Sequence, residues 1–434
     1  MKYGLDPNFR FTVSRAIYKG MLQFLAEQEG RKYVIQPLPI NSFAISKGEN
    51  NEFILNWKAT QDTLSKDAQP TKYYVMERIG GKDGFKNIAT TRVPTYKVEI
   101  SDNNIHCYQI IAANDGGKSF PSETLALGVA KDSKGDVLVV NGFTRISAPD
   151  WFDAGKIAGF YDAKDHGVPY VKDISFIGSM FEYRRDIPWM DDDAAGFGAS
   201  RANYETKVIA GNTFDYPYLH GSAIMDAGYS FVSSSVQAIN DGGQEMNKYK
   251  FVDLILGKQK ETIVGRGAVP NKYKAFPKEL QKAITSYCNN GGNLFISGAY
   301  VASDIWDNKN SDKEDIKFAE NVLGYKWRVG QASVTGEAFV VPTIYKTFKN
   351  EEFKFSNELN KDMYVVESPD SFYPADDNTG STFMRYKENN LVAGVLTYKP
   401  TYKVCVIGFP FETIKEQDSR NILMEQVMEF LNTK

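Results

Sequence analysis

Cysteine and histidine are scarce in this sequence of 434 residues, which holds three of each. A structural zinc site takes four cysteine or histidine ligands at short spacing, and no C-x-x-C or H-E-x-x-H pattern occurs. The three cysteines (Cys107, Cys288 and Cys405) are scattered and odd in number, unlike the framework of a disulfide-stabilised domain. We therefore expect no zinc bound by this chain alone and no cofactor.

Long apolar runs and an excess of positive charge are also missing. No stretch approaches the ~18 consecutive apolar residues of a membrane-spanning helix, so no membrane span is expected. The formal net charge is -3, whereas a nucleic-acid-binding domain usually carries a basic field. The first twenty residues lack the apolar core of a secretion signal. The hydrophobic content of 42% and charged content of 24% are ordinary for a globular chain of two or three domains.

Residues 1–35 predict an amphipathic helix that ends near Gly30. Its apolar positions recur at helical spacing and are Phe11, Ala16, Ile17, Met21, Phe24 and Leu25. This segment resembles the last helix of the zinc-dependent N-acetylmuramoyl-L-alanine amidase domain of bacterial cell-wall hydrolases. The resemblance implies a catalytic domain upstream of this chain. The alternative is a helix that packs on the domains that follow it.

Residues 36–130 predict an antiparallel β-sandwich, because short alternating runs are separated by Gly, Asp, Asn and Pro turns. The expected inward positions are Phe53, Leu55, Trp57, Tyr74, Met76, Tyr108, Ile110 and Ala112. The Trp of "LNW", the Tyr of "YYVMER" and the run from Tyr108 to Ser122 resemble a fibronectin type III domain. That resemblance implies a module that spaces other domains or binds a partner, without a catalytic set.

Residues 133–434 alternate strand and helix patterns, which indicates a parallel sheet covered on both faces. Buried strands are expected in "GDVLVVNGF", "KFVDLILGK", "GGNLFISGAY" and "TYKVCVIGF". We expect a flavodoxin-like doubly wound domain with large insertions. Ligands of such sheets bind beyond the carboxyl ends of the strands, which here are 141–145, 257–259, 297–303 and 408–412.

The runs "FVDLILG", "YCNNGGNLFISGAY" and "VIGFPFE" resemble the class I glutamine amidotransferase-like superfamily. Its enzymes carry a nucleophilic Cys on the strand-to-helix bend and a His base on a late strand. This chain has Ser297, Gly298 and Ala299 on the bend and Phe409 where the His would fall. Both catalytic partners are missing, so amidotransferase chemistry is rejected.

Ser297 is a candidate nucleophile in its own right, with His220 as its base and Asp215 or Glu412 as supporting carboxylates. The flanking residues are not the G-x-S-x-G of a hydrolase elbow. A serine at a strand end more often bonds nearby backbone or caps a helix. Both interpretations, a weak catalytic set and a structural serine, stay open.

The insertion at 144–218 is far longer than an ordinary strand-to-helix loop. Aromatic side chains make up 14 of the 70 residues from 151 to 220, or 20%, against 13% for the whole chain. Aromatic faces beside charged groups suit a carbohydrate, and the predicted ligand-binding residues are Trp151, Trp189, Arg201, Tyr300 and Asp304. The alternative is that the aromatics form a small core for the insertion.

The acidic run Asp191–Asp193 allows a calcium interpretation, with Asp191 and Asp193 as the candidate ligands. It lacks the D-x-D-x-D-G spacing of a calcium loop. A solvated acidic turn is the simpler interpretation.

The order of parts, with "GFGASRANYETKVIAGNTFDYPYLHG", resembles secreted Bacteroidetes proteins labelled xanthan lyase or N-acetylmuramoyl-L-alanine amidase. This implies a secreted, periplasmic or cell-surface protein with a glycan or peptidoglycan ligand. We predict a non-catalytic, glycan-binding accessory region of a cell-wall or polysaccharide-degrading protein. The alternative is a glycan-active hydrolase or esterase at the strand carboxyl ends.

Overall fold

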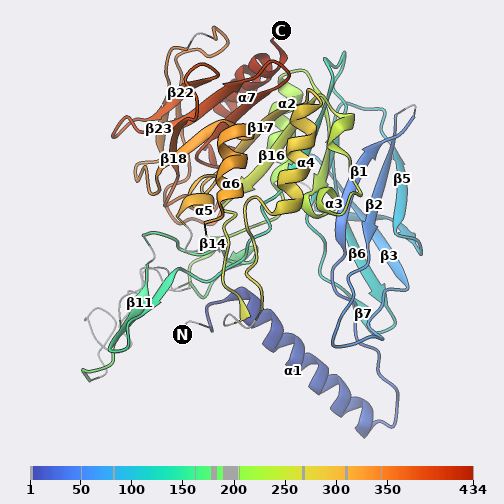
Figure 1. The fold of residues 1–434 in the computed structure, drawn as a ribbon. Helices are drawn as coiled ribbons and strands as arrows, with labels where there is room; N and C mark the ends of the chain where they lie inside the picture. Colours follow the sequence, from blue (N-terminus) through green and yellow to red (C-terminus); the bar gives the residue numbers. More distant parts are fainter. Residues whose placement is uncertain are drawn as a thin grey trace.

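The computed structural model describes residues 3–49, 51–81, 84–161, 163–176, 183–188, 204, 206–265, 269–307, 311–343 and 345–433. A β-sandwich lies beside a larger α/β part, helix α1 (Pro7–Gln28) lies below them, and a hairpin arm around β11 (Ile157–Phe160) extends to one side (Figure 1). Among the described residues, no helix has the length and apolar character needed to cross a membrane.

The segment after α1 forms the expected β-sandwich. One sheet has the order β1–β2–β5 and the other β4–β3–β6–β8, with every pair antiparallel and with short β7 on β6. The strands are β1 (Asn41–Lys47), β2 (Glu52–Lys58), β3 (Lys72–Ile79), β4 (Lys86–Thr91), β5 (Thr95–Glu99), β6 (Ile105–Asn114), β7 (Gly117–Lys118) and β8 (Leu125–Gly128). Phe53, Leu55 and Trp57 are buried as predicted, and Trp57 packs edge-on against Tyr73.

Strand β3 points the opposite way from the prediction. Tyr73 and Val75 are 5% and 0% exposed and face the core, while Tyr74 and Met76 are only half-buried. The prediction that Tyr74 and Met76 point inward is therefore wrong. Four consecutive apolar residues, "YYVM", do not alternate, and a slip of one residue exchanges the two faces of a strand.

Five strands of the C-terminal part pair in parallel, in the order β15–β9–β16–β17–β24. They are β9 (Asp136–Asn141), β15 (Ser230–Ser235), β16 (Phe251–Gly257), β17 (Asn293–Gly298) and β24 (Lys403–Ile407). Every residue of β16 is buried. Burial along a whole strand is expected where a parallel sheet is covered on both faces.

Helices cover the two faces of these strands. The first face carries α3 (Val236–Asn240), α4 (Lys278–Asn289) and α6 (Lys313–Phe318), and the second carries α2 (Tyr216–Asp226) and α7 (Gln417–Asn432). Val252 and Leu254 of β16 share one core cluster with Ile284 of α4. Ile255, on the opposite face of the strand, belongs to a second cluster with Leu423 of α7.

The sheet continues beyond β24 with antiparallel strands, so it is mixed rather than purely parallel. The added strands pair in the order β23–β22–β19–β20, and β18 pairs with β21 separately. They are β18 (Tyr325–Val329), β19 (Glu337–Val340), β20 (Glu352–Lys354), β21 (Ser371–Pro374), β22 (Gly380–Tyr386) and β23 (Val392–Tyr398). The connections from β22 to β23 and from β23 to β24 are short, and short connections permit only antiparallel neighbours.

The sandwich joins the parallel sheet through edge strand β15. Gly128 of β8 pairs with Phe231, and Ala44 of β1 pairs with Ser234. The hydroxyl of Ser233 also bonds both the N–H and the carbonyl of Ala126, at 2.7 Å each. The two parts therefore form one hydrogen-bonded unit, and the exposed edge of β15 is covered.

The described part of the insertion holds short strands that lie beyond the carboxyl ends of the parallel strands. Strand β11 pairs with β10 (Trp151–Asp153) and β13 (Tyr183–Arg184), and β12 (Lys172–Asp173) pairs with β14 (Ile209–Ala210). In Figure 1 the insertion lies below the α/β part, with β14 next to it and β11 further out.

Candidate binding cleft at the strand carboxyl ends

A cleft of about 780 Å³ opens beyond the carboxyl ends of β9 and β16. Its walls come from the residues before α1, the insertion, and the loop that follows β16. The side chains that define its character are Arg145, Asp150, Trp151, Tyr161, Lys260 and Glu261. The predicted edge of the sheet therefore does carry a hollow of ligand size.

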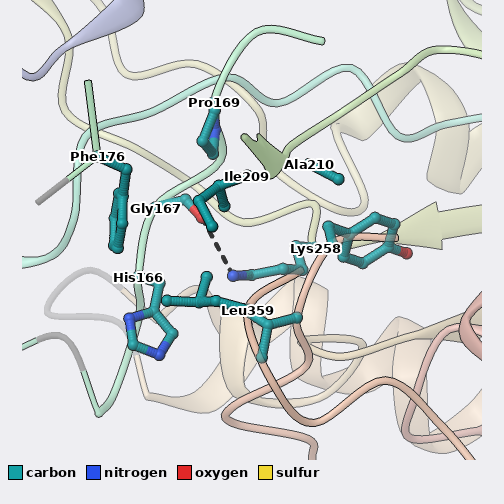
Figure 2. Close-up of a pocket in the computed structure, with 10 residues that line it drawn as sticks. His166, Gly167, Pro169, Phe176, Ile209, Ala210, Lys258 and Leu359 are labelled. Atoms are coloured by element: carbon teal, nitrogen blue, oxygen red, sulfur yellow. Dashed lines mark hydrogen bonds between the residues drawn. The ribbon is translucent and has the colours of Figure 1, made fainter. Parts of the chain in front are cut away.

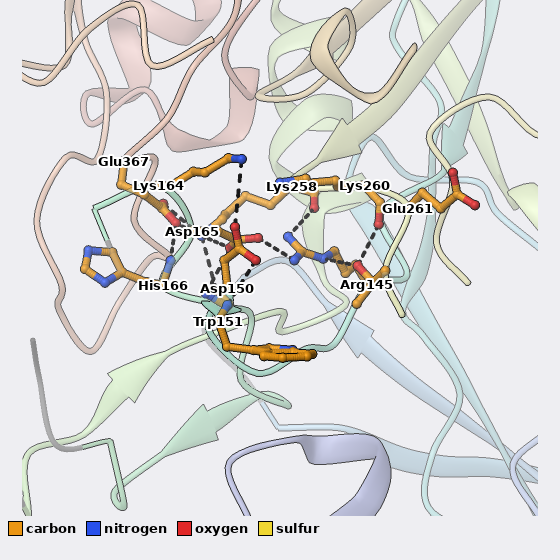
Figure 3. Close-up of polar contacts among 12 residues, drawn as sticks. Arg145, Asp150, Trp151, Lys164, Asp165, His166, Lys258, Lys260, Glu261 and Glu367 are labelled. Atoms are coloured by element: carbon orange, nitrogen blue, oxygen red, sulfur yellow. Dashed lines mark hydrogen bonds and ion pairs between the residues drawn. The ribbon is translucent and has the colours of Figure 1, made fainter. Parts of the chain in front are cut away.

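Two linked ion pairs lie beside the cleft (Figure 3), and the residues of the first, Arg145 and Asp165, line it. Arg145 contacts the Asp165 carboxylate at 2.5 Å, and both side chains are almost fully buried. Lys258 Nζ lies 2.7 and 2.8 Å from the two carboxylate oxygens of Glu367, and 3.8 Å from Asp165 Oδ1. Glu367 also accepts the backbone N–H of His166 at 2.6 Å. This network ties the ends of β9 and β16 to the insertion.

Asp165 and Arg145 hold each other in their charged forms. Burial by itself would raise the pKa of Asp165, but the Arg145 guanidinium and the Lys258 ammonium outweigh it and hold that pKa well below its usual range. In the same way Asp165 keeps the pKa of buried Arg145 above its usual value despite desolvation. Asp165 is therefore a permanent carboxylate and a poor proton donor at neutral pH.

Aromatic rings on the insertion form one wall. Trp151 is 36% exposed and Tyr161 is 51% exposed, and the Tyr161 ring lies 4.7 Å from that of Phe152. The pairing of Trp151 with Phe160 places this wall on the β10–β11 hairpin. On the same wall Asp153 binds Arg185 through two contacts of 3.0 Å, and Asp150 lies 3.9 Å from Lys164.

The loop after β16 forms the opposite wall and is held by side chains. Gln259 Oε1 accepts the backbone N–H groups of Thr144 and Arg145, both at 3.0 Å. Asp304, at the start of α5 (Ser303–Trp306), accepts the N–H of Glu261 at 2.6 Å and of Ala275 at 2.7 Å. Burial raises the pKa of Asp304 to about 6. Asp304 therefore supports the loop from behind.

The predicted ligand-binding residues fall into three groups. Trp151 lines the cleft. Tyr300 and Asp304 lie behind its wall, and both are buried; the Tyr300 ring centroid is 5.0 Å from Lys260 Nζ and 6.0 Å from Arg145 Cζ. Trp189 and Arg201 lie outside the described residues.

Two of the candidate catalytic residues meet in the interior. His220 is fully buried, with Nδ1 2.7 Å from Asp253 Oδ2 and Nε2 3.2 Å from Glu412 Oε2. Glu412 also accepts the Tyr364 hydroxyl at 2.6 Å. Burial would lower the pKa of His220, but the two carboxylates outweigh it and raise that pKa to about 9. The ring is therefore an imidazolium, which cannot accept a proton from a nucleophile.

The other two candidate catalytic residues are Ser297, which is enclosed, and Asp215, which is held in an ion pair. Ser297 is 0% exposed, and its hydroxyl has no hydrogen-bond partner among the described residues, His220 included. Asp215 forms a two-contact ion pair with Arg78 of the sandwich, at 2.6 and 2.9 Å. Asp215 thus joins the sandwich to the start of α2.

Asp191 and Asp193, the candidate calcium ligands, lie outside the described residues. Within the described ranges no group of three or more His, Cys, Asp or Glu side chains is arranged to hold a metal ion. The three cysteines are buried free thiols.

A second, much smaller cavity lies beside the ion-pair network (Figure 2). It has a volume of about 10 Å³ and is lined by His166, Phe176, Lys258 and Tyr364 among others. Lys258 Nζ donates to the Gly167 carbonyl across it at 3.1 Å. A space of this size holds at most a water molecule, so the large cleft is the candidate ligand site.

Sequence reasoning missed the charge network beside the cleft. Arg145 and Lys258 stand within the predicted strand ends 141–145 and 257–259, and a charged residue directly after a buried strand was an available signal. Their partners carried no such signal in the sequence, because Asp165 lies in the insertion and Glu367 lies 109 residues from Lys258.

No family model matches the chain, and no curated protein matches it. Among solved structures, the fibronectin type III domain of human fibronectin type III domain containing protein 3 is 23% identical over 24% of this chain and 94% of that chain, with a TM-score of 0.20. The twitchin kinase region of C. elegans is 24% identical over 20% of this chain and 16% of that chain, with a TM-score of 0.19. An exo-beta-1,4-mannosidase of an Opitutaceae bacterium is 10% identical over 50% of this chain and 31% of that chain, with a TM-score of 0.31.

Proposed function

We propose that the cleft beyond β9 and β16 binds a carbohydrate, and that this chain is a non-catalytic glycan-binding region. The observation that carries the proposal is the wall of exposed Trp151 and Tyr161 facing charged groups across a cleft of about 780 Å³. Sugar C–H faces stack on aromatic rings, while carboxylate, ammonium and guanidinium groups pair with hydroxyls.

The place of the cleft in the fold supports the proposal. Numbered along the chain, the five parallel strands have the order 2-1-3-4-5, which is that of a flavodoxin-like doubly wound sheet. In that arrangement the order reverses between the first and third strands, and ligands bind beyond the strand ends at this point. Here those strands are β9 and β16, and Arg145 and Lys260, which follow them, line the cleft.

A non-catalytic role fits the state of the candidate catalytic groups. The Ser297 hydroxyl is enclosed, and His220 is held between two carboxylates. Phe409, at the position of the amidotransferase histidine, is buried and stacked on Phe355 with ring centroids 4.6 Å apart. We infer a degenerate glutamine amidotransferase-like domain that keeps the fold without the reaction.

The wider setting is part of the same proposal. A glycan-binding region of this kind would serve a secreted, periplasmic or cell-surface protein that degrades cell wall or polysaccharide. Its catalytic domain, such as a zinc amidase, would belong to the upstream part of the parent chain. The fibronectin type III-like sandwich would then fix the position of the cleft relative to that domain.

A glycan array followed by isothermal titration calorimetry on the purified chain tests this function. Replacing the indole in W151A should weaken binding of a selected glycan by about tenfold or more, a free-energy loss of ~1.4 kcal/mol. The matched control is Y373A, because Tyr373 is a comparably exposed aromatic, at 44%, on β21 away from the cleft. Thermal unfolding of both variants checks that each retains its fold.

Two results would overturn the proposal. One is an array on which the wild-type chain binds no glycan. The other is binding that W151A and Y161A leave at wild-type affinity. Turnover of a bound glycan by the wild-type chain would instead favour the hydrolase alternative.

A further inference from the structure

Helix α1 carries an exposed apolar stripe, which the chain contacts at the N-terminal end of the helix, where the Phe9 ring lies 5.9 Å from that of Tyr3 and Arg10 pairs with Asp173. Phe9, Val13, Ile17, Met21 and Phe24 follow one another at spacings of three or four residues, which places them on one side of a helix. They are 42%, 38%, 58%, 60% and 61% exposed. A stripe of this length normally packs against another element.

The opposite side of α1 packs on the sandwich segment. Arg15 and Lys19 reach Asp62 of the sandwich segment at 2.8 and 3.0 Å. Ala26 is the buried residue of the helix. The outward direction of the apolar stripe is therefore set by ion pairs on the other side, and the helix cannot turn the stripe inward without breaking them.

Gly20 lies within the stripe, in the middle of the helix. A glycine inside a helix costs about 1 kcal/mol relative to alanine. A Cβ added there would have nothing within 4 Å among the described residues, so no contact within that part of the chain requires the glycine. A glycine on an exposed stripe allows close approach of another backbone.

The stripe is complementary to itself in an antiparallel arrangement. If two copies of α1 cross antiparallel about a two-fold axis between residues 16 and 17, Phe9 faces Phe24 of the second copy. Val13 then faces Gly20, while Ala16 and Ile17 lie on either side of the axis, each beside its own copy. Val13 meets the small Gly20 on both sides of the axis, and the two phenylalanines pair at the ends, as an isologous contact requires.

We propose that α1 is a dimerisation helix, and that its outward stripe pairs with the same stripe of a second copy of this chain. The five exposed side chains would bury on the order of 1,000 Å² counted over both copies, at the lower limit of specific interfaces. An interface of this size fits a reversible dimer rather than an obligate one.

Sedimentation velocity of the full chain over a range of micromolar concentrations tests the proposal. The expected result is a shift from 48.8 kDa to twice that mass as concentration rises. I17E should raise the dimer dissociation constant at least tenfold, because pairing would bury an uncompensated charge. F11E is the control, since it adds the same charge at another exposed apolar position of α1, at 40%, which stands at none of the three-, four- or seven-residue spacings of the stripe. Circular dichroism confirms that both variants keep their helix content.

Oxidation of a cysteine variant tests the register separately. A16C should form a disulfide-linked dimer, because the two Ala16 positions lie beside the axis. T12C should not, since Thr12 lies a full turn away and would face Met21 of the second copy. The three native cysteines are buried and give a low background.

A chain that stays monomeric at high micromolar concentration would overturn the proposal, as would dimers that I17E leaves intact. Flotation of a monomeric chain with phosphatidylcholine vesicles would overturn it in favour of a lipid surface. The result is separable from glycan binding, because I17E leaves the cleft unchanged and W151A leaves the stripe unchanged.

Discussion

His220 Nδ1 lies 2.7 Å from Asp253 Oδ2 in the interior, while its other ring nitrogen faces Glu412. Asp253 is on β16, Glu412 follows β24 and His220 is on α2, so one charged ring connects three elements of the α/β part. The imidazolium satisfies two carboxylates that would otherwise be buried without a counter-charge.

H220N should therefore destabilise the protein by about 3–5 kcal/mol, the cost of breaking a buried charge pair by removing one partner. Urea unfolding at neutral pH measures the loss. H106N is the matched control: His106 also lies between two carboxylates, Glu77 and Asp102, but Asp102 is 46% exposed and water can solvate it. This role is contradicted if the free energy of unfolding falls no further in H220N than in H106N.

The same cluster predicts a fall in stability at alkaline pH. The pKa of His220 is about 9 in the folded state and about 6.5 when unfolded, so the folded state binds the proton more tightly. The contribution, about 3 kcal/mol, is complete below pH ~6.5 and is lost as pH rises through ~9. Urea midpoints measured between these pH values should fall in the wild type. In H220N this part of the fall should vanish; a pH profile parallel to that of the wild type would contradict the assignment.

Asp304 should control the order of the cleft wall. In D304A the N–H groups of Glu261 and Ala275 lose their acceptor, which costs about 1–3 kcal/mol locally. Hydrogen–deuterium exchange should become faster at 261 and 275. D370A is the control, because Asp370 accepts the N–H groups of Ala302 and Ser303 in the same way, so its effect should appear at 302 and 303. Unchanged exchange at 261 in D304A would show that another contact holds the loop.

A substitution at Gly128 tests the junction between the sandwich and the sheet. A Cβ at this position would lie 2.2 Å from Met225 Sδ and 2.8 Å from a carbon of Phe231. G128A should therefore cost about 1–3 kcal/mol through overpacking. Because the two parts share one sheet, calorimetry should show a single transition at a lower temperature. G84A, at a position where a Cβ would have no atom of the described residues within 4 Å, should be close to neutral. Two separate transitions would show that the parts unfold independently.

The predictable part of the fold was the part with local signals. Alternation in β2 placed Phe53 and Trp57 correctly, and the continuous apolar run "VLVV" of β9 indicated a buried strand. The prediction for strand β3 failed because consecutive apolar residues do not show which side chains face the core. The packing of β3 against β6 decides which side is buried.

The candidate site was predictable only in position. The strand ends 141–145 and 257–259 follow from the buried strands, and Trp151 from the aromatic enrichment. The charge network does not follow from the sequence, because 109 residues separate Lys258 from Glu367 and only the folded sheet brings them together. His220 illustrates the same limit: a histidine near the start of a helix on this rim of the sheet suggests a base, and only the fold brings in the two carboxylates that keep it protonated.

The covered edge of β15 has a consequence for the order of synthesis. Strand β8 ends at Gly128 and its partner β15 begins at Ser230, so the sandwich emerges from the ribosome about 100 residues before its docking strand. At typical elongation rates this interval lasts roughly 5–20 s. During it the nascent sandwich presents the unpaired N–H and carbonyl of Ala126, which the Ser233 hydroxyl later satisfies. The newborn chain therefore passes through a stage in which β8 is an open template for pairing with another chain.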